Sequence, residues 1–229
     1  MSRIHFMKFT HIPFHKTGFF SKTMTDYLDQ KQSIKQFYNN FPDMKGFASQ
    51  INEKKKSFDL ATRLKLVTVL KDQYRNVVAT EATTKNINSL ENEETFTITT
   101  GHQLNLFTGP LYFLYKIIST INLTEMLAEQ FPDQRFVPVF WMATEDHDFE
   151  EINYFNFKGK KVTWDRPNGG AVGRFSLEGL QEVHAHFSKQ LGDTKNAIFL
   201  SQLFEKAYVS HNNLADATRY IANELFKSY

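Results

Sequence analysis

The stretch that determines the fold covers residues 96–142 and reads FTITTGHQLNLFTGPLYFLYKIISTINLTEMLAEQFPDQRFVPVFWM. Its first five residues are β-branched or aromatic and stop at Gly101, which predicts a strand that ends in a glycine-bounded loop. Its last seven residues are apolar on both faces, as expected for a strand buried between two helical layers. The stretch therefore predicts two strands separated by a loop and a helix.

Residues 111–130, between these strands, have the spacing of a helix that covers a sheet. Pro110 suits a first helical turn because its missing N–H would have no partner there, and Thr108 or Gly109 can serve as the cap. Pro132 cannot continue the helix, which should therefore end near residue 131. The predicted apolar stripe consists of Leu114, Ile117, Ile118, Ile121 and Ala128.

A strand, a long crossover and a second strand predict a parallel pair with a right-handed connection. Pro138 removes one hydrogen-bond donor from the second strand, which favours an edge position or the first residues of that strand. The centre of the chain is therefore predicted to be an α/β unit of the strand–helix–strand type.

The region before this centre is expected to be mostly helical over residues 20–90, most clearly over residues 60–78. Residues 88–94 are polar and without apolar periodicity, which predicts a loop at the entry to the core. The residues that recur at near-helical spacing are Leu60, Leu64, Val67 and Tyr74.

After residue 151 the pattern changes to short alternating pieces. Residues 152–157 and 161–164 are typical of strands, and the glycine-rich RPNGGAVGRF of residues 166–175 follows, which indicates a small antiparallel insertion. A last helix follows Asn212 or Asn213 as its cap, with Asp216 near its positive end. Its remaining signals are Leu214, Ala217, Ile221 and Leu225 as an apolar stripe and Lys227 near the negative end.

Such a helix normally returns to another core strand, so we expect the sequence to be truncated. The predicted segments are a mainly helical N-terminal region (1–90), the first half of the core (91–151), an inserted connecting segment (152–198) and helices returning to the core (199–229).

Charge and composition argue against several classes of partner. The 27 basic residues nearly balance the 25 acidic ones, so the net charge of +2 gives no reason to expect nucleic acid or an anionic membrane. Polar residues interrupt every apolar run near the N-terminus, and the apolar-rich residues 111–121 are too few to span a bilayer. Cysteine is absent, which excludes a disulfide framework, a thiolate metal site and a catalytic cysteine and fits a reducing cytoplasm. We therefore expect a cytoplasmic protein.

The loop that follows the first strand is the first candidate site, because open parallel sheets bind ligands at the carboxyl ends of their strands. Gly101 lets the backbone approach a ligand, N–H groups at a helix start accept anionic oxygens, and His102 and Gln103 offer further hydrogen bonds. Phosphate or carboxylate binding is the indicated chemistry. The alternative is a turn in which Gly101 and Gly109 only satisfy backbone geometry, and the pattern matches neither a Walker loop nor GxGxxG.

The second candidate is TEDHDFEE, residues 144–151, with five carboxylates and one histidine after a strand. Such crowding indicates either binding of a hard cation or acid–base work by a carboxylate whose neighbours shift its pKa. Asp146 and Asp148 share a face only if the segment is extended. The alternative is an acidic first turn that complements a helix dipole.

Two further patterns contain glycine or histidine. Residues 169–174 could wrap a phosphate with Arg174 as counter-charge, but a glycine hairpin within the insertion is the favoured interpretation. His184 and His186 lie two apart on a helix and point to different faces, so we predict no metal site there.

Three segments together resemble the bacillithiol biosynthesis cysteine-adding enzyme (BshC) family: TTGHQLNLFTGPLYFLYKIISTINL, FVPVFWMATEDHDFEEIN and GGAVGR. The resemblance is strong over residues 90–175 and looser before them. It implies a Rossmann-like parallel core similar to that of nucleotidylyl transferases and class I synthetases. It also implies inserted connecting segments and a homodimer formed through a C-terminal coiled coil that is absent here.

The resemblance further implies a ligase that joins the carboxyl group of cysteine to the free amine of glucosaminyl-malate, in the last step of bacillithiol biosynthesis. An amine does not displace hydroxide from a carboxylate at neutral pH, so activation through ATP follows by analogy of fold. His102 and Gln103 would stabilise charge on phosphate or carboxylate. Class I enzymes carry a histidine motif at this place, whereas a single histidine stands here.

In this scheme Asp146, His147 and Asp148 would orient the substrate amine or sugar hydroxyls, with one carboxylate as a candidate base. The further candidate binding residues are Gly101, Asn105, Gly109, Lys116, Glu145 and Arg174. No metal is predicted. Two alternatives stay open: a metal-dependent hydrolase centred on residues 145–151, and an inactive truncated fragment.

Overall fold

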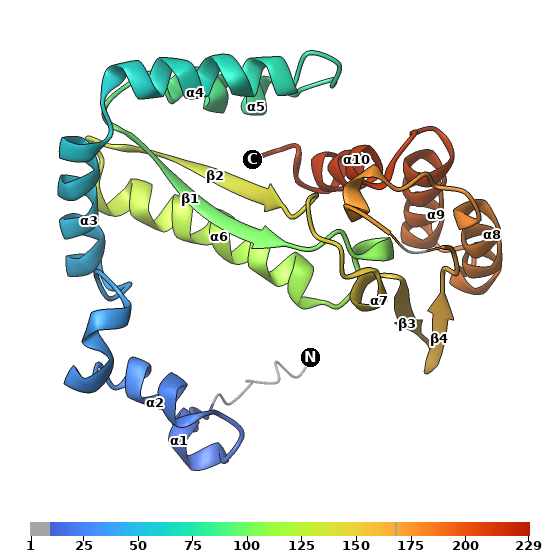
Figure 1. The fold of residues 1–229 in the computed structure, drawn as a ribbon, viewed down its shortest axis with the longest axis horizontal. Coiled ribbons are helices and arrows are strands. Elements are labelled where there is room, and N and C mark those ends of the chain that lie inside the picture. The colour runs from blue at the N-terminus through green and yellow to red at the C-terminus, as the bar shows by residue number, and fades with distance from the viewer. Residues whose placement is uncertain (1–9, 168) are drawn as a thin grey trace, which may run out of the picture. The chain divides into compact units, whose positions relative to one another are not determined.

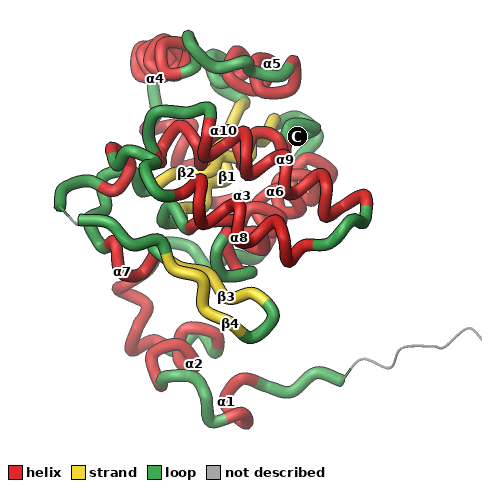
Figure 2. Tube along the Cα trace, turned by 90° about the vertical axis from the view of Figure 1, so that its right-hand side faces the viewer, coloured by secondary structure: helices red, strands yellow, loops and turns green. Residues whose placement is uncertain are grey.

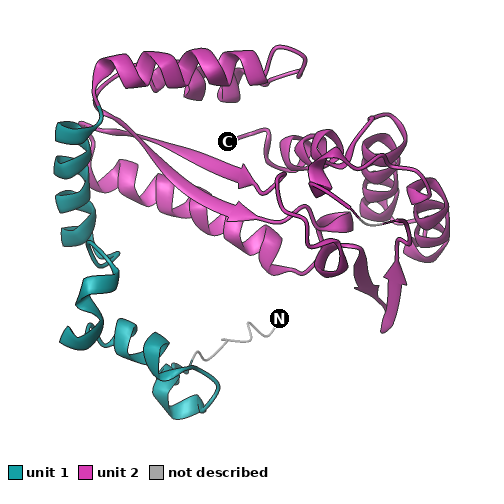
Figure 3. Cartoon of the chain, viewed as in Figure 1, with its two compact units in different colours: residues 1–58 teal, residues 59–229 magenta. Residues whose placement is uncertain are grey.

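The structure is a computed structural model that describes residues 10–167 and 169–229. The chain forms two compact units, Met1–Phe58 and Asp59–Tyr229 (Figure 3). The first nine residues of the predicted helical region and Asn168 of the glycine-rich segment lie outside the described residues. The division into four segments at residues 90, 151 and 198 remains a prediction.

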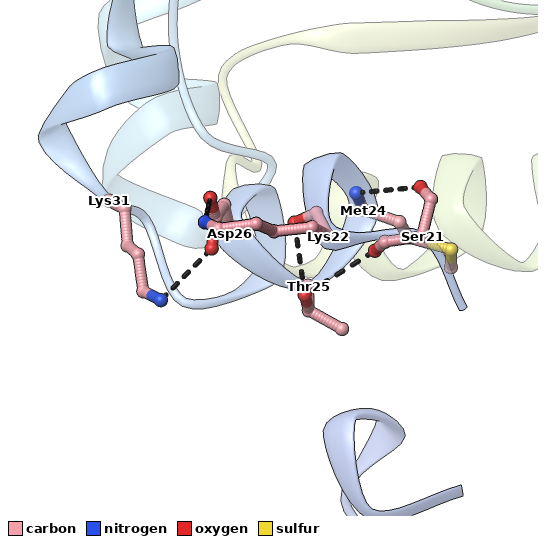
Figure 4. A network of polar contacts seen from close by, with 6 residues as sticks. All are labelled: Ser21, Lys22, Met24, Thr25, Asp26 and Lys31. Carbon is pink, nitrogen blue, oxygen red and sulfur yellow. Dashed lines mark hydrogen bonds and ion pairs between the residues drawn. The ribbon is translucent and has the colours of Figure 1, made fainter. Parts of the chain in front are cut away.

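The first unit is helical, as predicted. Its elements are α1 Phe14–Thr17, α2 Lys22–Leu28, the 3-10 helix η1 Gln32–Phe37 and α3 Met44–Ser57. The hydroxyl of Ser21 caps α2 by accepting from the N–H of Met24. Figure 4 shows that Lys22 and Lys31 both reach the buried carboxylate of Asp26. Hydrogen bonds from Lys22 and then Lys31 lower the pKa of Asp26, which therefore stays ionised.

The second unit begins with α4 Leu60–Gln73 and α5 Glu81–Ser89, which are capped by Asp59 and Thr80. The side chain of Arg63 is buried and donates to the carbonyl oxygens of Leu90 and Thr95, which ties α4 to the start of the first strand. The predicted helix over residues 60–78 is confirmed as far as Gln73, and of the residues at near-helical spacing Val67 is buried, whereas Leu60 and Leu64 are 48% and 47% exposed. The predicted loop before the core begins after Ser89 rather than at residue 88.

The centre of this unit is the predicted strand–helix–strand. β1 Thr95–His102 and β2 Arg135–Met142 are parallel, in a register that runs from Thr95 opposite Arg135 to His102 opposite Met142. α6 Tyr112–Gln130 connects them and packs along one face of the pair (Figure 1). Since β1 and β2 form a two-stranded sheet among the described residues, Pro138 lies in an edge strand, as predicted.

The two faces of the sheet are covered by different helices. Phe140 packs with Phe113 and Ile117 of α6 on one face, and Val137 and Val139 pack with residues of α4 and α5 on the other. The prediction that helices cover both faces of β2 is therefore confirmed, although only Phe136 and Val137 of this strand are fully buried. It is wrong for Trp141, which is 64% exposed at the carboxyl end of the strand.

The connecting helix differs from its prediction at its start and in its stripe. Leu111, not Thr108 or Gly109, is the residue before α6, and no side chain caps the helix. The predicted stripe is wrong at Ile118 and Ala128, which are exposed. The buried stripe is Phe113, Ile117, Thr120, Ile121, Thr124 and Leu127, in which threonine hydroxyls bond the carbonyl oxygens of the preceding turn.

The rest of the unit is a small sheet and a group of helices. Its elements are α7 Phe149–Ile152, β3 Tyr154–Phe157, β4 Lys160–Thr163, the 3-10 helix η3 Val172–Arg174, α8 Leu180–Leu191, α9 Lys195–Val209 and α10 Leu214–Phe226. β3 and β4 are antiparallel, as predicted. α9 packs on both α8 and α10 (Figure 2). Asn213 caps α10, and Leu214, Ala217 and Ile221 are buried, as predicted.

Most of the largest core cluster lies in this part of the unit, around Trp164, Phe187 and Phe204, and the loop after β1 also contributes to it. None of the described helices is both long and apolar enough to cross a membrane.

Candidate functional site

The carboxyl ends of β1 and β2 meet at one edge of the sheet, and the two predicted site segments follow them. Gln103 comes directly after β1, and its Nε2 atom donates to Oδ2 of Asp146 at 2.9 Å and to Oε2 of Glu151 at 2.8 Å. The amide of Gln103 therefore joins the loop after β1 to the acidic segment after β2. Glu151, which the sequence analysis did not single out as a site residue, belongs to the same arrangement.

Asp146 forms the centre of a tight turn. Its Oδ1 atom accepts from the backbone N–H groups of His147 at 2.7 Å and Asp148 at 3.0 Å. The N–H of Asp148 and the amide of Gln103 lower the pKa of the Asp146 carboxyl below its usual range. Asp146 is therefore a carboxylate at neutral pH whose oxygens are held in fixed directions.

The other acidic residues surround this turn and face solvent. Glu145, His147 and Asp148 are exposed, and Asp148 precedes α7 without capping it through its side chain. Glu150 and Glu151 lie in the first turn of α7, where carboxylates complement the helix dipole. Among residues 10–167 and 169–229, no three histidine or carboxylate side chains converge as metal ligands. The metal-dependent hydrolase therefore has no support in this segment.

The loop after β1 differs from the open glycine loop that the sequence analysis predicted. The strand continues through Gly101 and His102, so both residues belong to β1. Leu104, Leu106 and Phe107 are buried in the main core cluster. The loop is therefore packed against the core and does not form an open ligand-binding loop. The predicted end of the strand at Gly101 is one residue too early.

The two glycines of the loop have different roles. A Cβ atom on Gly101 would lie 3.6 Å from the nearest atom, the carbonyl oxygen of Trp141, which is an ordinary contact. A Cβ atom on Gly109 would lie 2.3 Å from the Cβ of the buried Asn105, and the φ of Gly109 is +50°. Backbone geometry therefore requires glycine at residue 109 and not at residue 101.

Phe107 and Thr108 adopt φ angles of +50° and +68°, which are uncommon for residues with a side chain. The ring of Phe107 packs on Phe155 and Tyr208. The backbone N–H of Phe107 donates to the buried hydroxyl of Tyr208 at 2.8 Å. These contacts hold the strained backbone in place. Nothing in the local sequence indicates this conformation, because it depends on residues of α9.

His102 lies beneath packed side chains rather than in solvent. It is 8% exposed, and the centre of its ring is 5.1 Å from that of Tyr112 and 5.5 Å from that of Phe113. Its Nδ1 atom donates to the carbonyl oxygen of Gln103 at 3.1 Å. Burial is the largest influence on the pKa of His102 and lowers it, against hydrogen bonds to Gln103 and Asn105. His102 is therefore neutral at pH 7, and its ring supports the backbone of Gln103.

Lys116 brings a positive charge to the carboxyl end of β1. Its Nζ atom donates to the carbonyl oxygen of Gly101 at 3.1 Å. Lys116 also lines a shallow hollow of about 360 Å³ between β1 and α6, together with Thr99 and Ser119. The cation is therefore fixed beside the strand end and accessible from solvent.

The glycine-rich segment docks onto the acidic turn. The N–H groups of Val172 and Gly173 donate to the carbonyl oxygens of Asp146 at 2.7 Å and Thr144 at 3.0 Å. A Cβ atom on Gly173 would lie 2.7 Å from Thr144, so only glycine fits there. The predicted glycine hairpin is wrong, because the segment forms the 3-10 turn η3 against the acidic turn. Arg174 is exposed at the end of η3.

Comparison with known families finds a match over residues 7–229 to a family described as bacillithiol biosynthesis BshC, N-terminal Rossmann-like domain. Curated relatives carry the name "Putative cysteine ligase BshC". The protein of Flavobacterium johnsoniae is 57% identical over 218 residues, which are 95% of this chain and 41% of the relative. That of Christiangramia forsetii is 54% identical over 222 residues, with the same shares, 95% and 41%.

A more distant relative, from Bacillus cereus, is 36% identical over 211 residues, which are 90% of this chain and 36% of the relative. The chain thus spans about two fifths of the length of the Flavobacterium johnsoniae and Christiangramia forsetii relatives. The similarity covers all the elements that form the edge of the sheet described above.

Proposed function

The chain belongs to the BshC family, in which it corresponds to the N-terminal Rossmann-like domain, and on this premise we propose that it serves a cysteine ligase. The proposed reaction joins the carboxyl group of cysteine to the free amine of glucosaminyl-malate, which forms one carbon–nitrogen bond and completes bacillithiol. We place the reaction in the cytoplasm, where thiols such as cysteine and bacillithiol stay reduced.

The single observation that carries the proposal is the position of the carboxylates of Asp146 and Glu151, held by Gln103 at the carboxyl edge of the sheet. Ligands of open parallel sheets bind at this edge. An anionic, hydrogen-bonding surface suits an ammonium group or sugar hydroxyls, and glucosaminyl-malate carries both. We assign the amine-bearing substrate to this surface.

Within this surface Asp146 has an orienting role. Its lowered pKa and its three donors make it a weak proton acceptor at neutral pH, so it suits a fixed contact to an amine or hydroxyl better than proton transfer. His147 and Asp148 are exposed beside it and are the candidates for proton transfer. Glu145 lies next to the turn and adds negative charge.

Activation of the cysteine carboxyl is the second requirement, and we propose ATP for it by analogy with related folds. In the loop after β1 the N–H groups of Phe107 and Gly109 bond Tyr208 and Leu106, so these two do not face a phosphate. The cations of Lys116 and Arg174 fit the charge of phosphate better, and we assign nucleotide contacts to them. His102 and Asn105 are then positioning residues that support the loop from below.

The experiment that tests this function is thiol profiling of a strain that lacks the gene encoding this chain. The proposal predicts loss of bacillithiol and accumulation of glucosaminyl-malate, both restored when the gene is returned. Unchanged bacillithiol in the deletion strain would contradict the proposal. The homodimer and its coiled coil remain predictions from the family resemblance.

A further inference from the structure

Trp141 is the accessible one of the two tryptophans in the chain. It is 64% exposed at the carboxyl end of β2, whereas Trp164 is 1% exposed and donates its indole N–H to the carbonyl oxygen of Glu178. Side chains alternate along a strand, so Trp141 projects from the face on which Val137 and Val139 pack with α4 and α5. The indole N–H of Trp141 bonds no other described residue. An aromatic ring with a free donor is thus presented to solvent at the edge of the sheet where ligands bind.

Gly101 is the neighbour of Trp141 on β1, and it adds no side chain beside the indole. The register pairs the two residues, and a Cβ atom on Gly101 would lie 3.9 Å from the Cβ of Trp141. That distance is an ordinary contact, and Gly101 is not among the glycines with a positive φ, so the backbone does not require glycine here. The absence of a side chain at residue 101 therefore provides space next to the indole rather than backbone freedom.

A cavity of about 560 Å³ is lined by Trp141 and by residues of α10, toward which β2 points in Figure 1. Arg219 of α10 donates to the carbonyl oxygen of Gln73, the last residue of α4, at 3.3 Å, and both residues line the cavity. Sites for small molecules typically measure about 300–1,000 Å³. The exposed indole is therefore part of the wall of a cavity that is large enough for a small molecule.

Three polar side chains that line this cavity have hydrogen-bonding groups to spare. They are those of Thr144, Glu145 and Asn223. None of the three bonds or pairs with another residue that the structure describes. Glu145 is exposed and comes directly before Asp146, the centre of the acidic turn. The cavity therefore offers an aromatic face, a carboxylate, a hydroxyl and an amide to a ligand.

We propose that Gly101, Trp141 and Glu145 form a subsite for the hexosamine ring of the amine-bearing substrate, an inference that rests on the proposed function. The C–H face of the sugar stacks on the indole, and the space beside Gly101 admits the ring. Glu145 faces the ammonium group, which is also attracted to the face of the indole. Thr144 and Asn223 bond the ring hydroxyls. Because Glu145 adjoins the acidic turn, the reacting amine stays at the carboxyl edge of the sheet.

The purine of a nucleotide also stacks on an indole, but the charges of the cavity favour the sugar. A nucleotide would bring its polyphosphate into a cavity that Glu145 and Asp216 line. The cation of Arg219, which lines the same cavity, is already paired with Asp216. That of Lys227 is paired with Glu224. An amino sugar carries the charge opposite to that of Glu145, so the cavity suits the sugar and not the nucleotide.

The test is a fluorescence titration of the purified chain with glucosaminyl-malate. Because Trp164 is buried, quenching by acrylamide reports mainly on Trp141. The proposal predicts that bound glucosaminyl-malate lowers the quenching constant at least about twofold, because small-molecule sites bury most of their ligand and the atoms it covers. The N-acetylated form of the compound, which lacks the ammonium group, should bind at least about tenfold more weakly. Quenching that stays unchanged, or that ATP lowers and glucosaminyl-malate does not, would overturn the proposal.

Replacing Glu145 with glutamine tests the ammonium contact. Glu145→Gln keeps the size of the side chain and removes its charge, so the variant should lose most of the preference for the free amine over the N-acetylated form. Glu205→Gln, at an exposed carboxylate of α9 that does not line the cavity, should keep this preference. The same preference in both variants would contradict the contact.

Two valine variants on one face of β1 separate the subsite from the fold. Gly101→Val fills the space beside the indole and should weaken binding of glucosaminyl-malate at least about tenfold in a calorimetric titration. Valine suits a strand, and its Cβ atom would make only ordinary contacts, so thermal unfolding should match the wild type. Thr97→Val is four residues earlier on the same face, does not line the cavity and should change neither quantity.

The outcome for the subsite is separate from that for the ligase. Equal affinity for glucosaminyl-malate in Gly101→Val and Thr97→Val would overturn the subsite. If the deletion strain had nonetheless lost bacillithiol, the ligase assignment would stand without it.

Discussion

Gln103 and Asp146 are 43 residues apart in the sequence, and the Nε2 atom of Gln103 lies 2.9 Å from Oδ2 of Asp146. The parallel pairing of β1 with β2 produces this contact, because it brings the two strand ends to one edge of the sheet. The same amide also holds Glu151 of α7. One neutral side chain thus contacts both carboxylates.

Replacing Gln103 with leucine should raise the pKa of Asp146. The Gln103 hydrogen bond is one of the causes that lower this pKa, and its loss also leaves Glu151 unscreened beside Asp146. Because a lowered carboxyl pKa stabilises the fold above the unfolded pKa, the variant should lose less stability than the wild type as pH falls through the folded pKa. NMR titration of Asp146 measures the shift. Gln190→Leu, at a half-buried residue of α8 whose amide contacts His186, is the matched control and should leave the Asp146 pKa unchanged.

Burial of His102 predicts a second pH dependence of the free energy of unfolding. Here the cause is a histidine that resists protonation in the folded state, not a carboxylate that stays ionised. The folded pKa of His102 is below its ordinary value of 6.5, so the unfolded chain binds a proton that the folded chain does not. Stability should therefore fall as pH drops from about 6.5 towards the lower folded pKa. Urea unfolding at several pH values measures the slope. His102→Gln should flatten it, and the same slope in His102→Gln as in the wild type would show that another group is responsible. His186→Gln, at an exposed histidine, is the control.

The buried guanidinium of Arg63 should contribute strongly to the stability of the second unit. It donates to the carbonyl oxygens of Leu90, Glu93 and Thr95 at distances of 2.9 to 3.3 Å. Arg63→Met should lower the free energy of unfolding by at least about 2 kcal/mol, because buried carbonyl groups lose their donor. Arg75→Met removes an exposed pair with Asp72 and should cost less than about 1 kcal/mol. Chemical denaturation measures both, and similar losses in the two variants would contradict the anchoring role of Arg63.

The two glycines near the site should respond differently to alanine. Gly173→Ala places a Cβ atom 2.7 Å from Thr144 and should destabilise the protein by about 1–3 kcal/mol. Gly101→Ala makes only an ordinary contact at 3.6 Å and should be tolerated. Thermal unfolding of the two variants measures the difference. Intact stability of Gly173→Ala would show that the glycine-rich segment does not dock on the acidic turn in solution.

The sequence predicted those features that depend on local patterns. The run of β-branched residues before Gly101, the helix that ends before Pro132 and the cap at Asn213 each depend on neighbours within a few residues, and each was confirmed. The parallel pairing followed from the length of the crossover. The meeting of the two candidate segments at one edge is a consequence of that pairing.

The features that the sequence did not predict depend on distant contacts. Phe107 keeps a positive φ because α9 supplies Tyr208, and the loop is buried because aromatic rings of α8 and α9 pack on Phe107. His102 looked like an exposed ligand, since its neighbours Tyr112 and Phe113 come from the following helix. Nothing in the sequence around Gln103 or Glu151 indicates the hydrogen bond between them.

The ligase assignment rests most directly on the carboxylate of Asp146, and complementation of the deletion strain measures its role. Genes that encode the wild type, Asp146→Asn and the exposed control Asp193→Asn are returned at equal protein level, and bacillithiol is quantified. We predict that Asp146→Asn lowers bacillithiol by at least about tenfold, while Asp193→Asn matches the wild type. Wild-type bacillithiol in cells that carry only Asp146→Asn would contradict the account.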